Sequence, residues 1–260
     1  MKKVAFLGMS IAALVFVSGL LLPAGASAQS TTWSWKGLYI GGNVGAARNH
    51  DTGVISCINP TGVLNGPGCP IPAFGSANGN GGIAGGQLGY NWQFNRIVVG
   101  PEVDLQTSTV QARSTFNGTV NCIGGGSSPV GYTSTNNITT LSTERLRLGF
   151  LASPKALIYV TGGLAQGQVN LKSSFQPASG PGTQNYPLNV SVQTHGFIEG
   201  VGGEMAVTQK LSAKLEVMMF NLRNVIPYAF AAPGVTAGYQ TGKDFEFHGA
   251  LVRLGFNWKI

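Results

Sequence analysis

Two carboxylates, Glu102 and Asp104, stand two residues apart, and two guanidinium groups, Arg145 and Arg147, repeat that spacing. In an extended strand, residues i and i+2 project from one face, so each pair presents two like charges side by side. Neighbouring carboxylates act as the acid and base of glycosidases when their environment keeps one of them protonated. Because a balanced set of cations accompanies these acids, we expect ionised, paired carboxylates and no enzyme activity.

Other reactive groups are dispersed along the chain. His50, His195 and His248 are far apart, and no Cys-x-x-Cys spacing occurs, so we predict no metal site and no cofactor. The glycine-rich run at 85–89 is not a dinucleotide fingerprint, because no helix follows it. A lipid-modifying enzyme would need a Ser/His pair, for which His248 is the one candidate.

The chain has three cysteines. Cys57 and Cys69 share one loop-like segment and are the expected disulfide pair, while Cys122 lies in another such segment. The other pairings remain open, because spacing alone does not choose among them. Disulfides are compatible with an exported protein.

The N-terminus predicts export. Lys2 and Lys3 precede an apolar run over residues 4–22, and Ala-Ser-Ala follows at 26–28. This layout is typical of a secretory signal peptide over residues 1–28. An uncleaved membrane helix is the alternative, but it does not account for the Ala-Ser-Ala ending. The mature chain, residues 29–260, is expected to form one domain.

The composition is unusual for a soluble enzyme. Only 10% of the residues are charged, and 39 are glycine. The net charge is +7, and its positive residues are scattered, so nucleic acid is not an expected partner. Such a chain indicates apolar surface that does not face water.

Alternation of apolar and polar residues predicts eight membrane-spanning strands. The segments are 37–47, 82–93, 97–110, 139–152, 156–170, 191–207, 211–222 and 243–260. Their connections alternate between short and long, which is typical of outer-membrane barrels with short periplasmic turns and long external loops. The predicted fold is an all-β, eight-stranded antiparallel transmembrane barrel with four long external loops and both ends in the periplasm.

The alternation also predicts which face is inside. In the last segment, Val252, Leu254 and Phe256 alternate with Arg253 and Gly255, and Leu251 is an apolar exception on the polar face. Glycine suits a crowded barrel axis and weakens a solvent-facing strand. The face with charge and glycine is therefore expected to point inward.

This phasing places four acids and four bases in the barrel interior. They are Glu102, Asp104, Arg145, Arg147, Glu204, Lys214, Glu216 and Arg253. Buried charges must be paired, and an eight-stranded barrel is just wide enough for side chains to fill it. We favour a structural ion-pair plug; the alternative is a set of charges that lines a narrow, ion-selective water path.

Two features concern the outer face. Aromatic residues near strand ends are candidates for the lipid–water boundary, with ordinary packing as the alternative: Trp92, Phe94, Tyr159, Phe256 and Trp258. An inward Glu204 also puts Glu199 toward lipid, which is unfavourable. We expect a β-bulge within residues 200–203 to shift the phase there.

Four motifs, in this order, resemble one family. They are the sequences at 35–43 (WKGLYIGGN), 159–165 (YVTGGLA), 211–216 (LSAKLE, after Glu204) and 252–259 (VRLGFNWK). The chain is similar to the OmpA-like, porin-family small outer-membrane barrels, the group of outer-membrane immunogenic and opacity-type surface proteins. Ile260 departs from the family pattern, in which an aromatic residue ends the closing strand.

The resemblance implies a barrel without catalytic residues that serves envelope integrity and contact with hosts or environment. It implies outer-membrane lipid, the barrel-assembly machinery and host or environmental surface ligands as partners. The chain ends at its last strand, so a periplasmic cell-wall domain is not expected. A porin-like channel for small solutes or ions is the alternative function.

Overall fold

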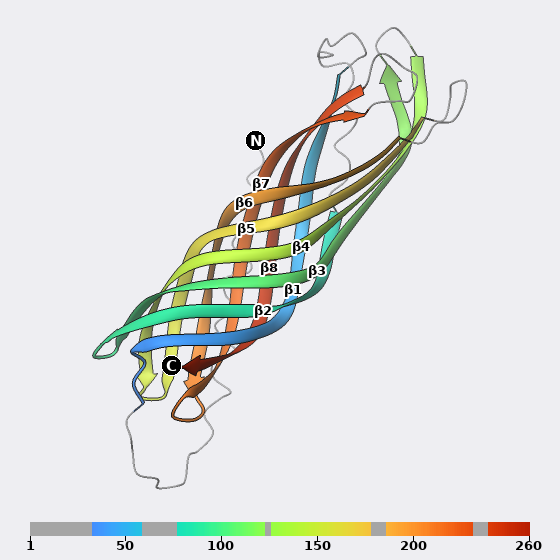
Figure 1. Ribbon diagram of the computed structural model, residues 1–260. Coiled ribbons are helices and arrows are strands. Elements are labelled where there is room, and N and C mark those ends of the chain that lie inside the picture. Colours follow the sequence, from blue (N-terminus) through green and yellow to red (C-terminus); the bar gives the residue numbers. More distant parts are fainter. Residues whose placement is uncertain (1–32, 59–76, 123–125, 178–185, 231–238) are drawn as a thin grey trace.

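The computed structural model describes residues 33–58, 77–122, 126–177, 186–230 and 239–260. These form eight antiparallel strands in one closed barrel, in which each strand pairs with its neighbours in sequence and β1 pairs with β8 (Figure 1). The strands are β1 Gly37–Ile58, β2 Ala77–Phe94, β3 Ile97–Cys122, β4 Gly126–Ser153, β5 Ala156–Pro177, β6 Tyr186–Ala206, β7 Leu211–Phe230 and β8 Tyr239–Lys259. The predicted fold class is confirmed. The predicted signal peptide and Cys69 lie outside the described residues.

The strand register shows how far the barrel is sheared. A walk along paired residues around the barrel passes Ile40, Leu88, Val103, Glu144, Leu164, Phe197, Asn221, His248 and His50. It leaves β1 at residue 40 and returns at residue 50, so the offset is ten residues. With eight strands, this offset corresponds to a strand tilt of about 40°. The interior of such a barrel holds side chains and little else.

A band of apolar side chains covers the outer wall next to the short turns. On β1 the band begins at Leu38 and ends below Arg48, which is exposed. On β5 it runs from Ile158 to Leu164, and Gln166 is the next outward residue. The band thus spans nine residues on β1, from Leu38 to Ala46, and seven on β5, from Ile158 to Leu164. A tilted strand that crosses a bilayer needs about nine to eleven residues, so the band is close to the thickness of a membrane.

Above the apolar band the pattern inverts. On β5, Gln166 and Gln168 point outward while Val169 and Leu171 are buried. The alternation of sides along β5 is unbroken, but apolar residues now face inward and polar residues outward. The barrel therefore has two zones: a lower zone with a polar interior and a lipid-facing wall, and an upper zone built like a soluble barrel.

A β-bulge lies in β4, away from the predicted position. Ile138 and Leu141 are both buried, and the pairing of β4 with β5 shifts by one residue between Ile138 and Thr140. The bulge predicted at 200–203 is wrong, because β6 pairs with β5 and β7 without interruption through these residues. Glu199 consequently stays on the outer wall, where it is exposed.

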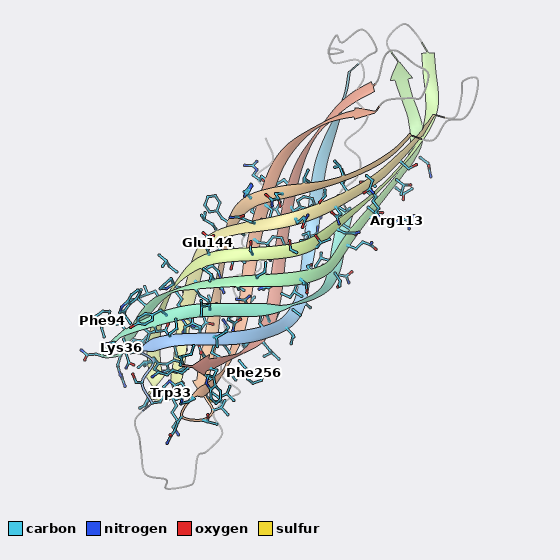
Figure 2. All side chains as sticks on the ribbon, in the orientation of Figure 1. Trp33, Lys36, Phe94, Arg113, Glu144 and Phe256 are labelled. Atoms are coloured by element: carbon cyan, nitrogen blue, oxygen red, sulfur yellow. The ribbon has the colours of Figure 1, made fainter. Side chains whose placement is uncertain are left out.

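No helix among the described residues is long and apolar enough to cross a membrane. The turns at the lower end, which is the predicted periplasmic end, are short: β2–β3 turns at Asn95, which has a positive φ of 54°, and β4–β5 turns at residues 154–155. In Figure 2 the labelled side chains of Trp33, Lys36, Phe94 and Phe256 gather at this end, whereas Arg113 lies toward the other.

Candidate functional site

Eight charged side chains fill the interior of the lower zone. They are all at most 5% exposed: Glu102, Asp104, Arg145, Arg147, Glu204, Lys214, Glu216 and Arg253. They come from β3, β4, β6, β7 and β8, and alternation turns each of them away from lipid. We call this group the charge cluster.

Glu102 is the centre of the charge cluster. Its carboxylate pairs with Arg145 and accepts hydrogen bonds from Lys214 Nζ at 2.9 Å to both oxygens. Arg147 Nη1 lies 3.6 Å from Oε2, and Arg253 Nη2 lies 3.5 Å from Oε1. One carboxylate thus contacts all four cations of the charge cluster.

Two more acids extend the network across the barrel. Glu216 lies 2.6 Å from Arg253 Nε, and 3.3 Å from both Arg145 Nη1 and Lys214 Nζ. Asp104 Oδ2 lies 2.9 Å from Arg145 Nη2 and 3.0 Å from Arg253 Nη2. Because the cations are shared, no single pair can be removed without leaving another partner incompletely compensated.

Glu204 closes the charge cluster toward the periplasm. It lies 2.9 Å from Arg147 Nη1 and accepts hydrogen bonds from Ser212 Oγ at 2.5 Å and Asn257 Nδ2 at 2.8 Å. These neutral donors satisfy the remaining lone pairs of a buried carboxylate, which would otherwise raise the cost of burial.

Two tyrosines complete the network. Tyr39 donates to Glu102 at 2.8 Å and Tyr159 donates to Glu216 at 2.9 Å. The Arg147 guanidinium carbon lies 4.7 Å from the centre of the Tyr39 ring and 5.2 Å from that of Tyr159. Two cation–π contacts therefore flank this arginine.

The inward tyrosines were not predicted. Tyr39 lies between the apolar residues Leu38 and Ile40, and Tyr159 was a candidate for an aromatic belt, with ordinary packing as the alternative. The belt position is wrong for Tyr159 and the packing alternative holds, because this residue is 3% exposed and lies in a buried cluster.

Glycines opposite the tyrosines are a signal that could have located them. Gly89 pairs with Tyr39 and Gly202 pairs with Tyr159. A Cβ on Gly89 would stand 2.1 Å from the Tyr39 hydroxyl, and one on Gly202 would stand 2.5 Å from Tyr159 Cζ. Each ring therefore occupies the space that a side chain on the opposing strand would fill.

Apolar layers lie on both sides of the charge cluster. Toward the periplasm, buried Trp35, Val98, Leu151, Leu157 and Tyr159 pack together. Toward the external end, a larger apolar layer includes Leu141, Met218, Phe220, Leu222 and Leu251. The order along single strands shows this directly: β4 runs from Leu151 through Arg147 and Arg145 to Leu141. Leu251, the apolar exception on the polar face of β8, belongs to the upper layer.

A few polar atoms of the interior have no protein partner. Arg147 Nη2, Arg253 Nη1 and Gln106 Oε1 are buried without a hydrogen bond. In a polar interior, such atoms are where ordered water binds. The charges of the cluster are balanced, but these three polar atoms have no hydrogen-bond partner within the protein.

The other predicted residues are not brought together. Cys57 is in β1 and Cys122 ends β3, and the pairing of Cys57 with Cys69 stays a prediction. Four belt candidates, Trp92, Phe94, Phe256 and Trp258, are 44–63% exposed on the outer wall.

His50 and His248 are paired across β1 and β8 on the outer wall of the upper zone, and His195 lies on β6. Within the described residues, no group of three or more His, Cys, Asp or Glu could hold a metal ion.

A closed eight-stranded barrel with an apolar outer band and a polar interior is the architecture of small outer-membrane proteins. The profile of the outer membrane protein beta-barrel domain matches residues 14–257 of this chain. The chain belongs to this family. Its place is the outer membrane.

Two relatives share this length. The 31 kDa outer-membrane immunogenic proteins of Brucella melitensis biotype 1 and Brucella suis biovar 1 are each 30% identical to the chain over 257 residues, which cover 96% of this chain and 93% of the relative. The family resemblance inferred from the sequence is confirmed.

The chain also matches solved outer-membrane proteins, at low sequence identity. The outer membrane protease OmpT of Escherichia coli has a TM-score of 0.47 and 10% identity, over 90% of this chain and all of that one. OprG of Pseudomonas aeruginosa has a TM-score of 0.41 and 12% identity, over 86% of this chain and 98% of that one. Neither likeness supports a statement about activity.

Proposed function

We propose that this outer-membrane barrel is a non-enzymatic envelope protein whose closed body anchors external connections for contact with the surroundings. In this proposal the charge cluster is structural: it holds the barrel wall together and does not conduct. The proposed partners are outer-membrane lipid, the barrel-assembly machinery and host or environmental surface ligands.

The position of the charge cluster between two apolar layers is the observation that carries the proposal. A water-filled channel needs polar lining along its length, and apolar constrictions oppose it by dewetting. Here Phe220 and Leu222, 5% and 0% exposed, fill the interior above the ion pairs. Charge sharing among Glu102, Glu216 and their cations suits a rigid plug rather than an ion path.

The names of the relatives agree with a surface role. The two Brucella proteins are called outer-membrane immunogenic proteins, which says that they elicit an immune response. If this chain is exposed in the same way, soluble ligands and antibodies would reach the ends of β3 and β4 and the other external connections.

An ion channel is the second candidate function. The unpartnered atoms Arg147 Nη2 and Arg253 Nη1 favour some water within the lower zone. In this alternative the charged residues would select the ions that pass.

Single-channel recording in planar bilayers separates the two functions. We expect no steady conductance from the purified, folded barrel. Reproducible channels that disappear when Arg145→Gln and Arg147→Gln are combined would overturn the closed-barrel proposal. As a matched control, Arg113→Gln and Lys172→Gln remove two exposed cations of β3 and β5 and should leave any trace unchanged.

A further inference from the structure

Cations surround the periplasmic end of the barrel. Each short turn carries one, and so does each end of the strand set: Lys36, Arg96, Lys155, Lys210 and Lys259. The first four are exposed, and Lys259 is partly exposed. We call these five residues the cationic rim.

No Asp or Glu side chain balances the cationic rim. The chain has nine Asp and Glu residues. Four are in the charge cluster, two stand higher on the outer wall, and three are on β1 and β8 in the upper zone: Glu102, Asp104, Glu204 and Glu216; Glu144 and Glu199; Asp51, Asp244 and Glu246. The charged side chains at the periplasmic end are therefore all positive.

The cationic rim continues directly from the lipid-facing band. Arg96 lies against the outward Phe150, with its guanidinium carbon 5.7 Å from the ring centre. Lys259 Nζ lies 5.9 Å from the centre of the Trp33 ring and donates to the Ser34 carbonyl at 2.7 Å. In Figure 2, Lys36 and Phe94 appear at the same end of the barrel. These cations are thus at the level where acyl chains give way to headgroups.

We propose that the cationic rim binds the phosphate groups of anionic phospholipids in the periplasmic leaflet of the membrane. The apolar band next to the cationic rim fixes the choice of occupant, because the lipid whose chains cover that band brings its headgroup to the rim. The cationic rim then enriches anionic phospholipid around the barrel and sets the depth at which the barrel stands.

Electrostatics gives the size of the effect. The electrostatic attraction between one Lys or Arg and an anionic lipid surface is strong enough to enrich anionic lipid up to ~fivefold per side chain. Five cations shared among several surrounding lipids should give about a threefold preference for phosphatidylglycerol over phosphatidylcholine. The preference should vanish in ~1 M salt, where the screening length is about 3 Å.

The test measures lipid selectivity of the folded full chain. The barrel is reconstituted in phosphatidylcholine vesicles with spin-labelled phosphatidylglycerol or phosphatidylcholine, and electron paramagnetic resonance gives the fraction of each label held at the protein. We expect the ~threefold preference to fall to about one in the double variant Lys155→Glu, Lys210→Glu. A mobility shift on boiling in detergent gels checks that each variant is folded.

The matched control is Arg113→Glu with Lys172→Glu, which reverses two exposed cations far from the periplasmic turns. It should keep the threefold preference. Equal loss in both double variants would show that net charge, and not the cationic rim, selects lipid, and would overturn the proposal. No preference in the unmodified chain would also overturn it.

Two further arms exclude other anions. Inorganic phosphate, added at constant ionic strength, should not reduce the preference; loss specific to phosphate would show a site for the free ion. Sedimentation with purified peptidoglycan should be weak and equal for all variants. Peptidoglycan binding that disappears in Lys155→Glu, Lys210→Glu while lipid selectivity stays would assign the cationic rim to the cell wall.

Discussion

Glu102 is one carboxylate with four cationic neighbours, so its removal cannot be compensated locally. Lys214 has a comparable position, because its ammonium lies 2.9 Å from Glu102 and 3.3 Å from Glu216. Removing one partner of a buried ion pair leaves an uncompensated charge, whereas removing both leaves a neutral cavity.

We predict that Glu102→Gln lowers the free energy of unfolding by about 3–5 kcal/mol, because it leaves four cations with three acids. The double variant Glu102→Gln, Lys214→Met should recover part of this loss. Urea unfolding in lipid vesicles, followed by the gel mobility of the unboiled protein, measures both effects.

Glu246→Gln is the matched control. Glu246 lies 3.1 Å from Arg223 Nε and 3.4 Å from His248 Nε2, but its side chain is 32% exposed. The loss of such a pair should cost less than ~1 kcal/mol. If Glu102→Gln were as mild as Glu246→Gln, the interior would have to be hydrated, and the plug would be refuted.

At the scale of the strand, the periplasmic ends were predictable and the external ends were not. The predicted start of β3 and of β5 agrees with Ile97 and Ala156. At the external end, β3 continues from the predicted residue 110 to Cys122. The prediction depended on apolar outward residues, and above the lipid-facing band the outward residues are polar.

The interior was likewise predictable in the lower zone and not in the upper zone. The eight charges could be assigned to the inside because their strand neighbours are apolar and face lipid. The upper apolar layer could not, because inward Val169 alternates with outward Gln168, the reverse of the pattern lower on β5. The contact of Glu102 with all four cations depends on how the strands are aligned with one another. Composition and alternation do not reveal that strand register.

Two outward acids mark a weak sector of the wall. Glu144 on β4 and Glu199 on β6 are exposed beside the same stretch of β5, where they pair with Leu164 and Gly162 (Figure 2 labels Glu144). By the tilt of the strands, both stand within the external half of the apolar band. A carboxylate that faces acyl chains is unfavourable there.

We therefore predict that Glu144→Leu and Glu199→Leu each stabilise the barrel in lipid vesicles by about 1 kcal/mol. Urea unfolding in vesicles measures the change. The matched control is Gln168→Leu, above the band on β5, where added apolar surface meets water and should give no gain. Destabilisation by either acid-to-leucine change would show that a polar partner covers this sector.

On the scale of the whole molecule, the outer wall of the lower zone faces lipid and that of the upper zone faces water. The tryptophans mark the periplasmic boundary of the lipid-facing zone. All four tryptophans of the chain lie at the periplasmic end: Trp33, Trp35, Trp92 and Trp258. Trp92 and Trp258 are 44% and 51% exposed toward lipid, whereas Trp35 is 3% exposed. Intrinsic fluorescence thus reports one boundary of the membrane.

We predict that phospholipids brominated near the headgroup quench this fluorescence more strongly than those brominated near the chain end. The reason is that aromatic residues of a belt stand at headgroup level. Trp92→Phe with Trp258→Phe should remove most of the quenching, and Trp35→Phe should remove little. Stronger quenching by phospholipids brominated near the chain end would show that these tryptophans lie near the bilayer centre. That result would contradict the position of the apolar band described above.

The length of β3 and β4 also determines reach. Among the residues of β3 whose side chains the structure describes, Leu105 is the last apolar one that points outward, and the strand continues to Cys122. At ~3.3 Å per residue and a tilt of about 40°, β3 ends roughly 40 Å above the hydrocarbon. A layer of lipid sugars that hides a short barrel would leave this tip uncovered, so the surface contact proposed above would not require a partner to penetrate that layer.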